Sequence, residues 1–237
     1  MGKLAGLVRR ALPLRVRQAI RTGLVPDSSQ DGEGAVLEKL MAGLACEEWV
    51  IDVGANDGVV ISNSLPFIER GWRGIMIEPA PAVYKKLIAN HGHRKNVTCL
   101  QIACCDKAGE ADLYIGSDGE EGFMSTLCTL ENGWFDFARS STLVKVQTDT
   151  LTNVLKQHHA PARPGLLLVD CEGMDYEVLL GLDFEQFRPA VIVTEEFEIE
   201  PEKQVGKYSL LIRANYGLVH KIGCNTIWRD HSAAKRV

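Results

Sequence analysis

The chain has 237 residues and a formal net charge of −5, with 46% hydrophobic and 24% charged residues. This length predicts one main domain, or two at most, and the apolar content is sufficient for a sizeable core, which excludes a disordered chain. No apolar run approaches the roughly 18–20 residues needed to cross a bilayer. The net negative charge argues against nucleic acid as a partner.

The first 26 residues differ in charge from the rest of the chain. They contain no acid, and their basic residues are Lys3, Arg9, Arg10, Arg15, Arg17 and Arg21. Aliphatic side chains alternate with these charges on both sides of Pro13, which is typical of an interrupted basic amphipathic helix. Two interpretations follow: a helical arm that is solvated or packs on a partner, or an arm that attaches loosely to an anionic membrane surface or to a complex that makes surface polysaccharide.

We therefore expect an arm and linker over residues 1–29 and a folded domain over residues 30–237. The expected location is cytoplasmic, either free or peripheral at the inner face of the membrane. The cysteines are Cys46, Cys99, Cys104, Cys105, Cys128, Cys171 and Cys224. Their number is odd and none forms C-x-x-C, which favours free thiols in a reducing compartment over disulfides or zinc ligands.

Hydrophobic periodicity predicts alternating strands and helices along the folded domain. The predicted strands are residues 49–53, 74–78, 96–104, 111–115, 143–147, 165–169 and 191–194. The predicted helices are residues 35–43, 59–70, 82–91, 151–158 and 208–215, and a hairpin is predicted at residues 217–223 and 225–229. This order predicts an α/β fold with a doubly wound sheet that is mostly parallel and ends in an antiparallel hairpin.

The domain is organised around residues 51–58, which read IDVGANDG. Glycine lets the backbone adopt a positive φ or approach a ligand closely, and a carboxylate accepts hydrogen bonds from a cationic group. Gly54 and Gly58 have the spacing G-x-x-x-G, which differs from the G-x-G-x-x-G of dinucleotide sites. Asp52 and Asp57 would also repel a pyrophosphate. The turn therefore favours a small ligand with a cationic end over NAD.

A further acid, Glu78, ends the apolar run of residues 74–78. In doubly wound folds an acid at the end of the second strand can accept both hydroxyls of a ribose. A ribose combined with an ammonium or sulfonium group is S-adenosylmethionine, which we predict as the cofactor. The predicted cofactor-binding residues in these two segments are Asp52, Gly54, Ala55, Asn56, Asp57, Glu78 and Pro79.

Three segments, in this order and at domain spacing, resemble the FkbM-type methyltransferases. They are residues 51–58, residues 71–79 (GWRGIMIEP) and residues 169–175 (VDCEGMD). The similarity runs from about residue 30 to about residue 229. It implies a class I methyltransferase (Rossmann-like) fold and S-adenosylmethionine-dependent O-methylation, which in this family often acts on sugars or natural products.

The resemblance also extends the predicted site. The adenine in such sheets commonly lies just beyond the third strand, which implies contacts from Ala103 and Cys104. The insert at residues 116–141 has the length and aromatic content of a lid over the acceptor, and Ser125 resembles a serine of the corresponding loop in the family. The family usually has Thr-Leu-Asp or Thr-Leu-Asn where this chain has Thr-Leu-Thr-Asn at residues 150–153, so no acidic role is transferred there.

The candidate catalytic residues are the acids Asp170, Glu172 and Glu195. Asp170 and Glu195 follow predicted buried strands, whose carboxyl ends form the ligand edge of an open α/β sheet. The acids could remove the proton of an acceptor hydroxyl or bind a divalent ion, although no dedicated metal site is predicted. Asp170 is also a candidate cofactor contact. The alternative for Glu172 and Asp175 is structural, because acids near a helix start satisfy free N–H groups.

The sequence therefore predicts an S-adenosylmethionine-dependent O-methyltransferase of a small hydroxylated acceptor, with a sugar or glycan as the leading candidate. Two alternatives are retained. One is a non-catalytic ligand-binding or scaffold protein on the same fold. The other is an NAD-dependent oxidoreductase, which the missing G-x-G-x-x-G turn makes less favourable.

Overall fold

The computed structural model describes residues 32–117, 128–130, 140–196 and 200–233. The predicted arm at residues 1–29, Ser125 and most of the predicted lid lie outside the described residues. The described helices are α3 (Glu33–Ala42), α4 (Leu65–Glu69), α5 (Pro81–His91), α6 (Leu151–Gln157), α7 (Asp175–Leu180) and α8 (Pro201–Arg213). None of them is long and apolar enough to cross a membrane.

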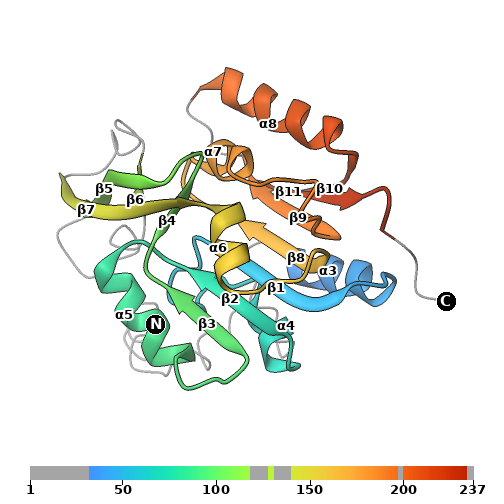
Figure 1. Ribbon diagram of the computed structural model, residues 1–237, viewed down its shortest axis with the longest axis horizontal. Coiled ribbons are helices and arrows are strands. Elements are labelled where there is room, and N and C mark those ends of the chain that lie inside the picture. Colours follow the sequence, from blue (N-terminus) through green and yellow to red (C-terminus); the bar gives the residue numbers. More distant parts are fainter. Residues whose placement is uncertain (1–31, 118–127, 131–139, 197–199, 234–237) are drawn as a thin grey trace, which may run out of the picture.

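The described strands form two sheets (Figure 1). The larger contains β1 (Glu47–Val53), β2 (Arg73–Ile77), β3 (Val97–Leu100), β8 (Pro164–Val169), β9 (Val191–Glu195), β10 (Tyr216–Ile222) and β11 (Asn225–Asp230). The smaller contains β4 (Ala103–Cys105), β5 (Gly109–Ser117), β6 (Cys128–Thr129) and β7 (Ser140–Thr150).

The order of the larger sheet is β10-β11-β9-β8-β1-β2-β3. All neighbouring strands are parallel except β11, which is antiparallel to β9 and β10. The chain runs outward from β1 through β2 to β3 and then returns to β8 on the other side of β1. This reversal creates a switch point between β1 and β8, where open α/β sheets bind their ligands. The predicted mostly parallel sheet with a terminal antiparallel hairpin is confirmed.

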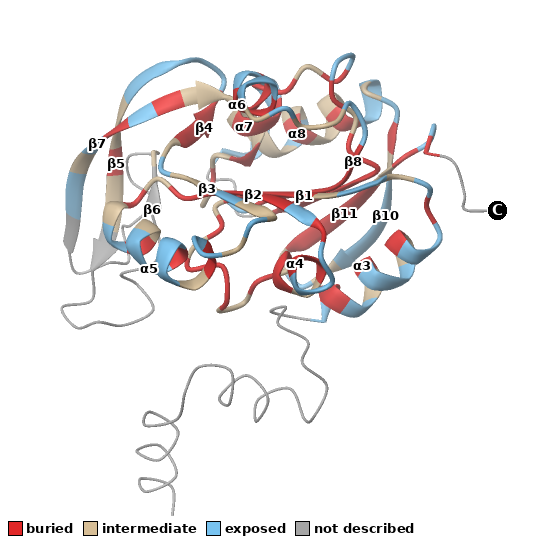
Figure 2. Cartoon of the chain, turned by 60° about the horizontal axis from the view of Figure 1, so that its bottom comes forward, coloured by how far each residue is buried: buried red, intermediate tan, exposed pale blue. Residues whose placement is uncertain are grey.

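The helices cover both faces of the larger sheet, as Figure 2 shows. Helices α6, α7 and α8 contribute to one apolar cluster and α3 and α4 to a second on the opposite face. Strand β8 has the sequence PGLLLV and is buried at every position. Its apolar side chains point to both faces of the sheet, so both faces must be covered by helices. A continuous apolar run of this kind is typical of a central parallel strand.

The predicted third strand at residues 96–104 is wrong as a single strand. Residues 97–100 pair with β2 in the larger sheet, whereas residues 103–105 pair with β7 in the smaller one. Both segments are mainly apolar, and one polar residue between them, Gln101, is too weak a signal to reveal the change of sheet at residues 101 and 102. The smaller sheet, which the sequence did not predict, packs on α5 through Ala80, Val83, Ala103, Leu113 and Val146.

The predicted helix at residues 59–70 is also wrong over most of its length, because only α4 is helical there. The Asp57 carboxylate accepts the backbone N–H groups of Val59 and Val60, and Ile61 adopts a positive φ of 52°. These features hold the segment in a turn before the short helix begins at Leu65, with Pro66 in its first turn. Helix α8 begins earlier than predicted, at Pro201, a residue favoured in the first turn of a helix.

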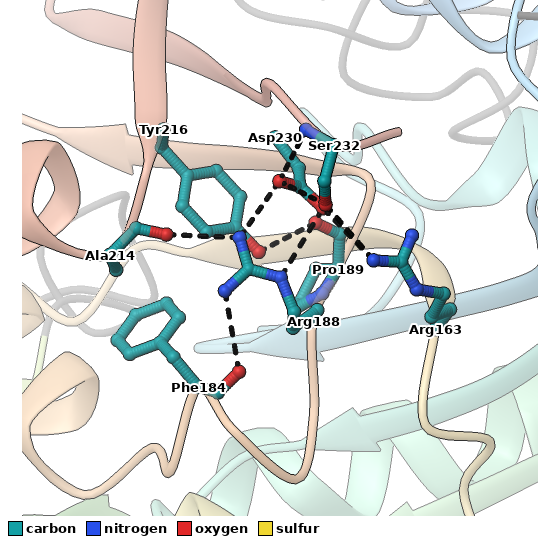
Figure 3. Close-up of polar contacts among 8 residues, drawn as sticks. All are labelled: Arg163, Phe184, Arg188, Pro189, Ala214, Tyr216, Asp230 and Ser232. Atoms are coloured by element: carbon teal, nitrogen blue, oxygen red, sulfur yellow. Dashed lines mark hydrogen bonds and ion pairs between the residues drawn. The ribbon is translucent and has the colours of Figure 1, made fainter. Parts of the chain in front are cut away.

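A polar network closes the amino edge of the larger sheet, opposite the switch point (Figure 3). Asp230 is fully buried, and its Oδ1 accepts a hydrogen bond of 2.8 Å from Arg188. Ser232 donates to both Asp230 oxygens, and Arg163 forms a longer ion pair of 3.8 Å. This network joins the end of β11 to the segments that precede β8 and β9.

Candidate functional site

The turn after β1 has the tight backbone that its glycines predicted. Gly54, Asn56 and Gly58 have φ angles of 84°, 52° and 70°. A Cβ at Gly54 would lie 1.8 Å from the backbone oxygen of Asp170, so only glycine fits this position. The turn after β1 and the residue after β8 are therefore in direct contact at the switch point.

Backbone hydrogen bonds attach this turn to the end of β2. The N–H groups of Gly54 and Ala55 both donate to the carbonyl of Ile77, at 3.0 and 2.9 Å. Glu78 follows Ile77 and is almost fully buried. Its Oε2 accepts from the Asn56 N–H at 3.1 Å, and its Oε1 accepts from the Ala80 N–H at 2.8 Å.

These bonds fix the orientation of the Glu78 carboxylate. A carboxylate oxygen has two lone pairs and can accept more than one hydrogen bond. The carboxylate is thus held in one orientation, as a group that accepts ribose hydroxyls should be. Asn56 lies beside it, partly buried, and Pro79 follows it on the loop into α5.

Asp57 and Asp52 have different surroundings within the same turn. One oxygen of Asp57 is used inside the turn, since it accepts the N–H groups of Val59 and Val60, both at 2.8 Å. Asp52 is buried on β1, and its Oδ2 accepts a hydrogen bond from Ser64 Oγ at 2.5 Å. Ser64 was not predicted, because its role depends on a contact between the end of β1 and the start of α4.

Burial raises the pKa of Asp52 to about 6, and the negative charge of Asp170 adds to the rise while the Ser64 hydrogen bond opposes it. A carboxyl with this pKa changes charge close to neutral pH. A cation bound nearby would lower the pKa again, because it stabilises the ionised form. The protonation state of Asp52 should therefore depend on the charge of the ligand that the turn binds.

Asp170 and Glu195 form a second acidic element, at the carboxyl ends of β8 and β9. Glu195 is buried, and its Oε1 lies 3.5 Å from Cys224 Sγ in the turn between β10 and β11. Its Oε2 is buried without a hydrogen-bond partner of good geometry among the described residues. Asp170 is exposed, although the protein that surrounds it reduces its solvation.

The two carboxyls interact strongly. Reduced solvation raises the pKa of both, and the negative charge of Asp170 raises the pKa of Glu195 further. Two carboxyls that interact in this way resist ionising together, because the negative charge of one raises the pKa of the other. The coupling therefore favours one proton and one negative charge on the pair at the edge of the sheet.

Asp175 and Glu172 lie between these two strand ends. Asp175 is the first residue of α7, and its oxygens accept the N–H groups of Cys171 and Glu195 at 2.9 and 2.8 Å. These contacts are structural, but they join the loop after β8 to the end of β9 and do not cap the N–H groups of α7 as the structural alternative expected. Glu172 precedes the helix and has a positive φ of 50°, so it does not lie in the first turn of α7, where the structural alternative for an acid at a helix start would apply.

The two residues proposed near the adenine lie on β4. The Cys104 side chain belongs to the apolar core beside Ile77 and Leu151, and burial raises its thiol pKa well above the usual range. Ala103 packs with Ala80, which precedes α5, and with Val83 of α5. None of the six cysteines described with their side chains forms a disulfide: Cys46, Cys99, Cys104, Cys105, Cys171 and Cys224.

The site residues fit S-adenosylmethionine at three points. Glu78 offers a buried and oriented carboxylate for ribose hydroxyls, and Asp52 and Asp170 can provide negative charge for the ammonium and sulfonium. The close approach of Gly54 to Asp170 brings the first and third of the predicted segments together. In the described part of the chain, no three His, Cys, Asp or Glu side chains are arranged to hold a metal ion.

A seven-stranded sheet of this order, with a glycine turn after β1 and an acid after β2, has the architecture of the class I methyltransferase fold. The methyltransferase FkbM domain matches residues 52–216. The chain therefore belongs to the FkbM methyltransferase family, as the sequence segments indicated, and the family implies S-adenosylmethionine as the cofactor. No curated protein matches the sequence.

The similar solved structures are distant in sequence. The FkbM methyltransferase of Methylobacillus flagellatus KT is 16% identical, with a TM-score of 0.48, and the match covers 77% of this chain and 43% of that one. This chain thus spans less than half the length of that protein. The precorrin-6y C5,15-methyltransferase of Geobacter metallireducens GS-15 is 12% identical, with a TM-score of 0.44 and coverage of 86% and 90%.

Proposed function

We propose that this protein is an S-adenosylmethionine-dependent O-methyltransferase that acts on a hydroxyl of a small acceptor, with a sugar or glycan as the first candidate. The observation that carries the proposal is the Asp170 and Glu195 carboxyl pair beside the glycine turn. A hydroxyl is a poor nucleophile until its proton is removed, and a positioned carboxylate can accept that proton. The raised pKa of Glu195 favours its protonated form, which leaves the negative charge of the pair on Asp170.

S-adenosylmethionine supplies a methyl group on a sulfonium, and the protein must align that methyl with the acceptor oxygen. In this proposal Glu78 holds the ribose, and Asp52 with the turn at residues 54–57 holds the methionine end. Asp170 accepts the hydroxyl proton, and Glu195, with its unpartnered buried oxygen, supports the charge of Asp170 by sharing its proton. Glu172 is proposed to contact the acceptor from the same edge.

Methyl transfer from labelled S-adenosylmethionine to a panel of acceptors tests this proposal. The panel contains sugars and other alcohols, with amines and thiols as competing classes. We expect the wild type to transfer the methyl group to a hydroxyl. In Asp170→Asn the rate of this transfer should fall at least about a hundredfold, because the variant lacks the general base. Asp112→Asn is the matched control, because Asp112 is a partly exposed acid on β5 that pairs with Lys145.

The outcomes separate the alternatives. Transfer to an amine or thiol, or full activity of Asp170→Asn, would contradict the proposal. Binding of S-adenosylmethionine without transfer to any acceptor would instead favour the non-catalytic scaffold.

A further inference from the structure

The glycine turn after β1 depends on contacts from outside itself. Three of its residues, Gly54, Asn56 and Gly58, have a positive φ, and Ile61 follows with another. For residues other than glycine such conformations cost free energy and persist only when surrounding structure holds them. The contacts that hold this turn therefore decide whether a ligand meets it in one conformation.

The carboxyl end of α5 provides two such contacts from neighbouring residues. Asn90 Nδ2 donates to the carbonyl of Asp57 at 2.8 Å, and His91 Nε2 lies 2.9 Å from the carbonyl of Gly58. A carbonyl oxygen can only accept, so the hydrogen of the His91 ring must be on Nε2. Two consecutive carbonyls of the turn are thus held by two consecutive side chains of the helix.

His91 is suited to this task as a neutral side chain. It is fully buried, and its Nδ1 has no hydrogen-bond partner among the described residues. Burial lowers its pKa, with Arg94 and His93 adding to the effect, while the Gly58 hydrogen bond and the Asp57 charge oppose it. In the described structure, the contact with Gly58 is therefore the one hydrogen bond that the His91 side chain makes.

The packing around this contact is tight. A Cβ at Gly58 would lie 2.6 Å from His91 Nε2 and 2.9 Å from Leu87 Cδ1, so the turn lies directly on α5. Ala55 also packs with Leu87. Helix α5 starts just after Glu78, which itself binds the Asn56 N–H. The helix therefore connects the turn of β1 to the acid of β2.

We propose that Asn90 and His91 are positioning residues that hold the turn at residues 54–60 at a fixed distance from Glu78, so that the two ends of the cofactor site are preorganised. This inference rests on the proposed function, because the cofactor is the ligand that both ends would bind. Neither residue touches the cofactor in this proposal. Without their side chains the turn can adopt other conformations. Binding of the cofactor must then select the competent conformation, which costs free energy and weakens affinity.

Calorimetric titration with S-adenosylhomocysteine tests the proposal in variants of the full chain. Asn90→Ala is expected to weaken binding about three- to tenfold, the effect of losing one hydrogen bond, and His91→Leu about tenfold or more. His91→Gln places an amide donor near the position of Nε2 and is expected to bind within about twofold of the wild type. This rescue distinguishes a hydrogen bond from general packing.

Asn96→Ala is the matched control. Asn96 Nδ2 donates to the carbonyl of Trp72 at 2.7 Å, a bond of the same kind at the other end of β2, away from the turn. Its loss is expected to lower the unfolding temperature as Asn90→Ala does, but to leave affinity unchanged. Equal affinities of Asn90→Ala, His91→Leu and the wild type would overturn the proposal.

Hydrogen exchange of the backbone amides in residues 56–60 gives a second readout without ligand. Exchange is expected to accelerate in Asn90→Ala and not in Asn96→Ala, because only the first loosens the turn. Unchanged exchange in Asn90→Ala would overturn the proposal, whatever the ligand. If the wild type does not bind S-adenosylhomocysteine at all, the proposed function fails, and the exchange result still decides whether α5 holds the turn.

Discussion

Gly54 lies directly against the backbone of Asp170, so that a Cβ on Gly54 would come within 1.8 Å of the Asp170 carbonyl oxygen. This contact joins the turns after β1 and β8 at the switch point of the sheet. It also places the predicted cofactor turn beside the carboxyl pair that we propose as the base. The geometry of the site thus depends on a glycine that no other residue can replace.

Gly54→Ala is expected to lower the free energy of unfolding by about 3 kcal/mol or more, because it combines a positive φ with a severe clash. Gly71→Ala is the control, since Gly71 also has a positive φ, of 95°, but a Cβ there would meet no atom within 4 Å. The control should lose only about 1–2 kcal/mol. Urea denaturation measures both, and equal losses would show that the contact with Asp170 is unimportant.

Cofactor affinity should depend on pH through Asp52. Burial raises its pKa to about 6, and a cationic ligand binds better to the ionised form. Affinity for S-adenosylmethionine should therefore increase about tenfold between about pH 5 and about pH 7. In Asp52→Asn this increase should be absent. Calorimetry across this range provides the measurement, and a parallel increase in the variant would assign the titration to another group.

Glu195→Gln should change how stability depends on pH. Burial and the charges of Asp170, Glu172 and Asp175 raise the pKa of Glu195 above its ordinary 4.5. A raised carboxyl pKa contributes stability that is complete below the unfolded pKa and is lost as pH rises through the folded pKa. Glutamine has no proton to lose, so the variant should gain stability relative to the wild type between about pH 5 and about pH 9.

Urea denaturation at several pH values tests this difference. Glu110→Gln serves as control, because Glu110 is an exposed acid of β5 that accepts a hydrogen bond from Gln147. Its stability difference from the wild type should stay constant over the same range. A constant difference for Glu195→Gln would mean that Glu195 is ionised in the folded protein.

Asp230→Asn should destabilise the fold without affecting the site. Asp230 is buried and accepts hydrogen bonds from Arg188 and Ser232 at the amino edge of the sheet (Figure 3). Removing one charge of a buried ion pair leaves the other poorly compensated, so the loss should be about 2–4 kcal/mol. Because the network lies opposite the switch point, affinity for S-adenosylhomocysteine should stay within about twofold of the wild type.

The corresponding exposed pair provides the comparison for Asp230. Asp112→Asn, which breaks the pair with Lys145 on the smaller sheet, should lose no more than about 1 kcal/mol. A similar loss in both variants would contradict a special role for the buried network.

Much of the larger sheet could be predicted from the sequence, because its central strands are short apolar runs that end in an acid or a glycine. The runs before Gly54, Glu78, Asp170 and Glu195 all became strands, and the acids lie at the carboxyl edge as expected. The break between β3 and β4 could not be predicted, since a single polar residue, Gln101, separates two apolar runs while the partner strand changes.

Contacts between distant residues account for most of what the sequence missed in the site. Ser64 donates to Asp52, and His91 contacts Gly58, across separations that leave no local pattern. The short length of α4 has a similar cause, because the Asp57 side chain binds N–H groups that a helix would otherwise use. A sequence indicates which residue types can take such roles, but only the fold determines which of them meet.

The most direct test of the central claim is calorimetric titration of the wild type and of Glu78→Ala with S-adenosylmethionine and S-adenosylhomocysteine, with NAD as the control ligand. Glu78→Gln accompanies them as a variant of similar size, because Glu78 also holds the Asn56 and Ala80 N–H groups. We predict saturable binding of both sulfur ligands by the wild type, no binding of NAD, and affinity at least about tenfold weaker in both variants while they remain folded. Absence of binding by the wild type, or unchanged affinity in the folded variants, would contradict the account of this site.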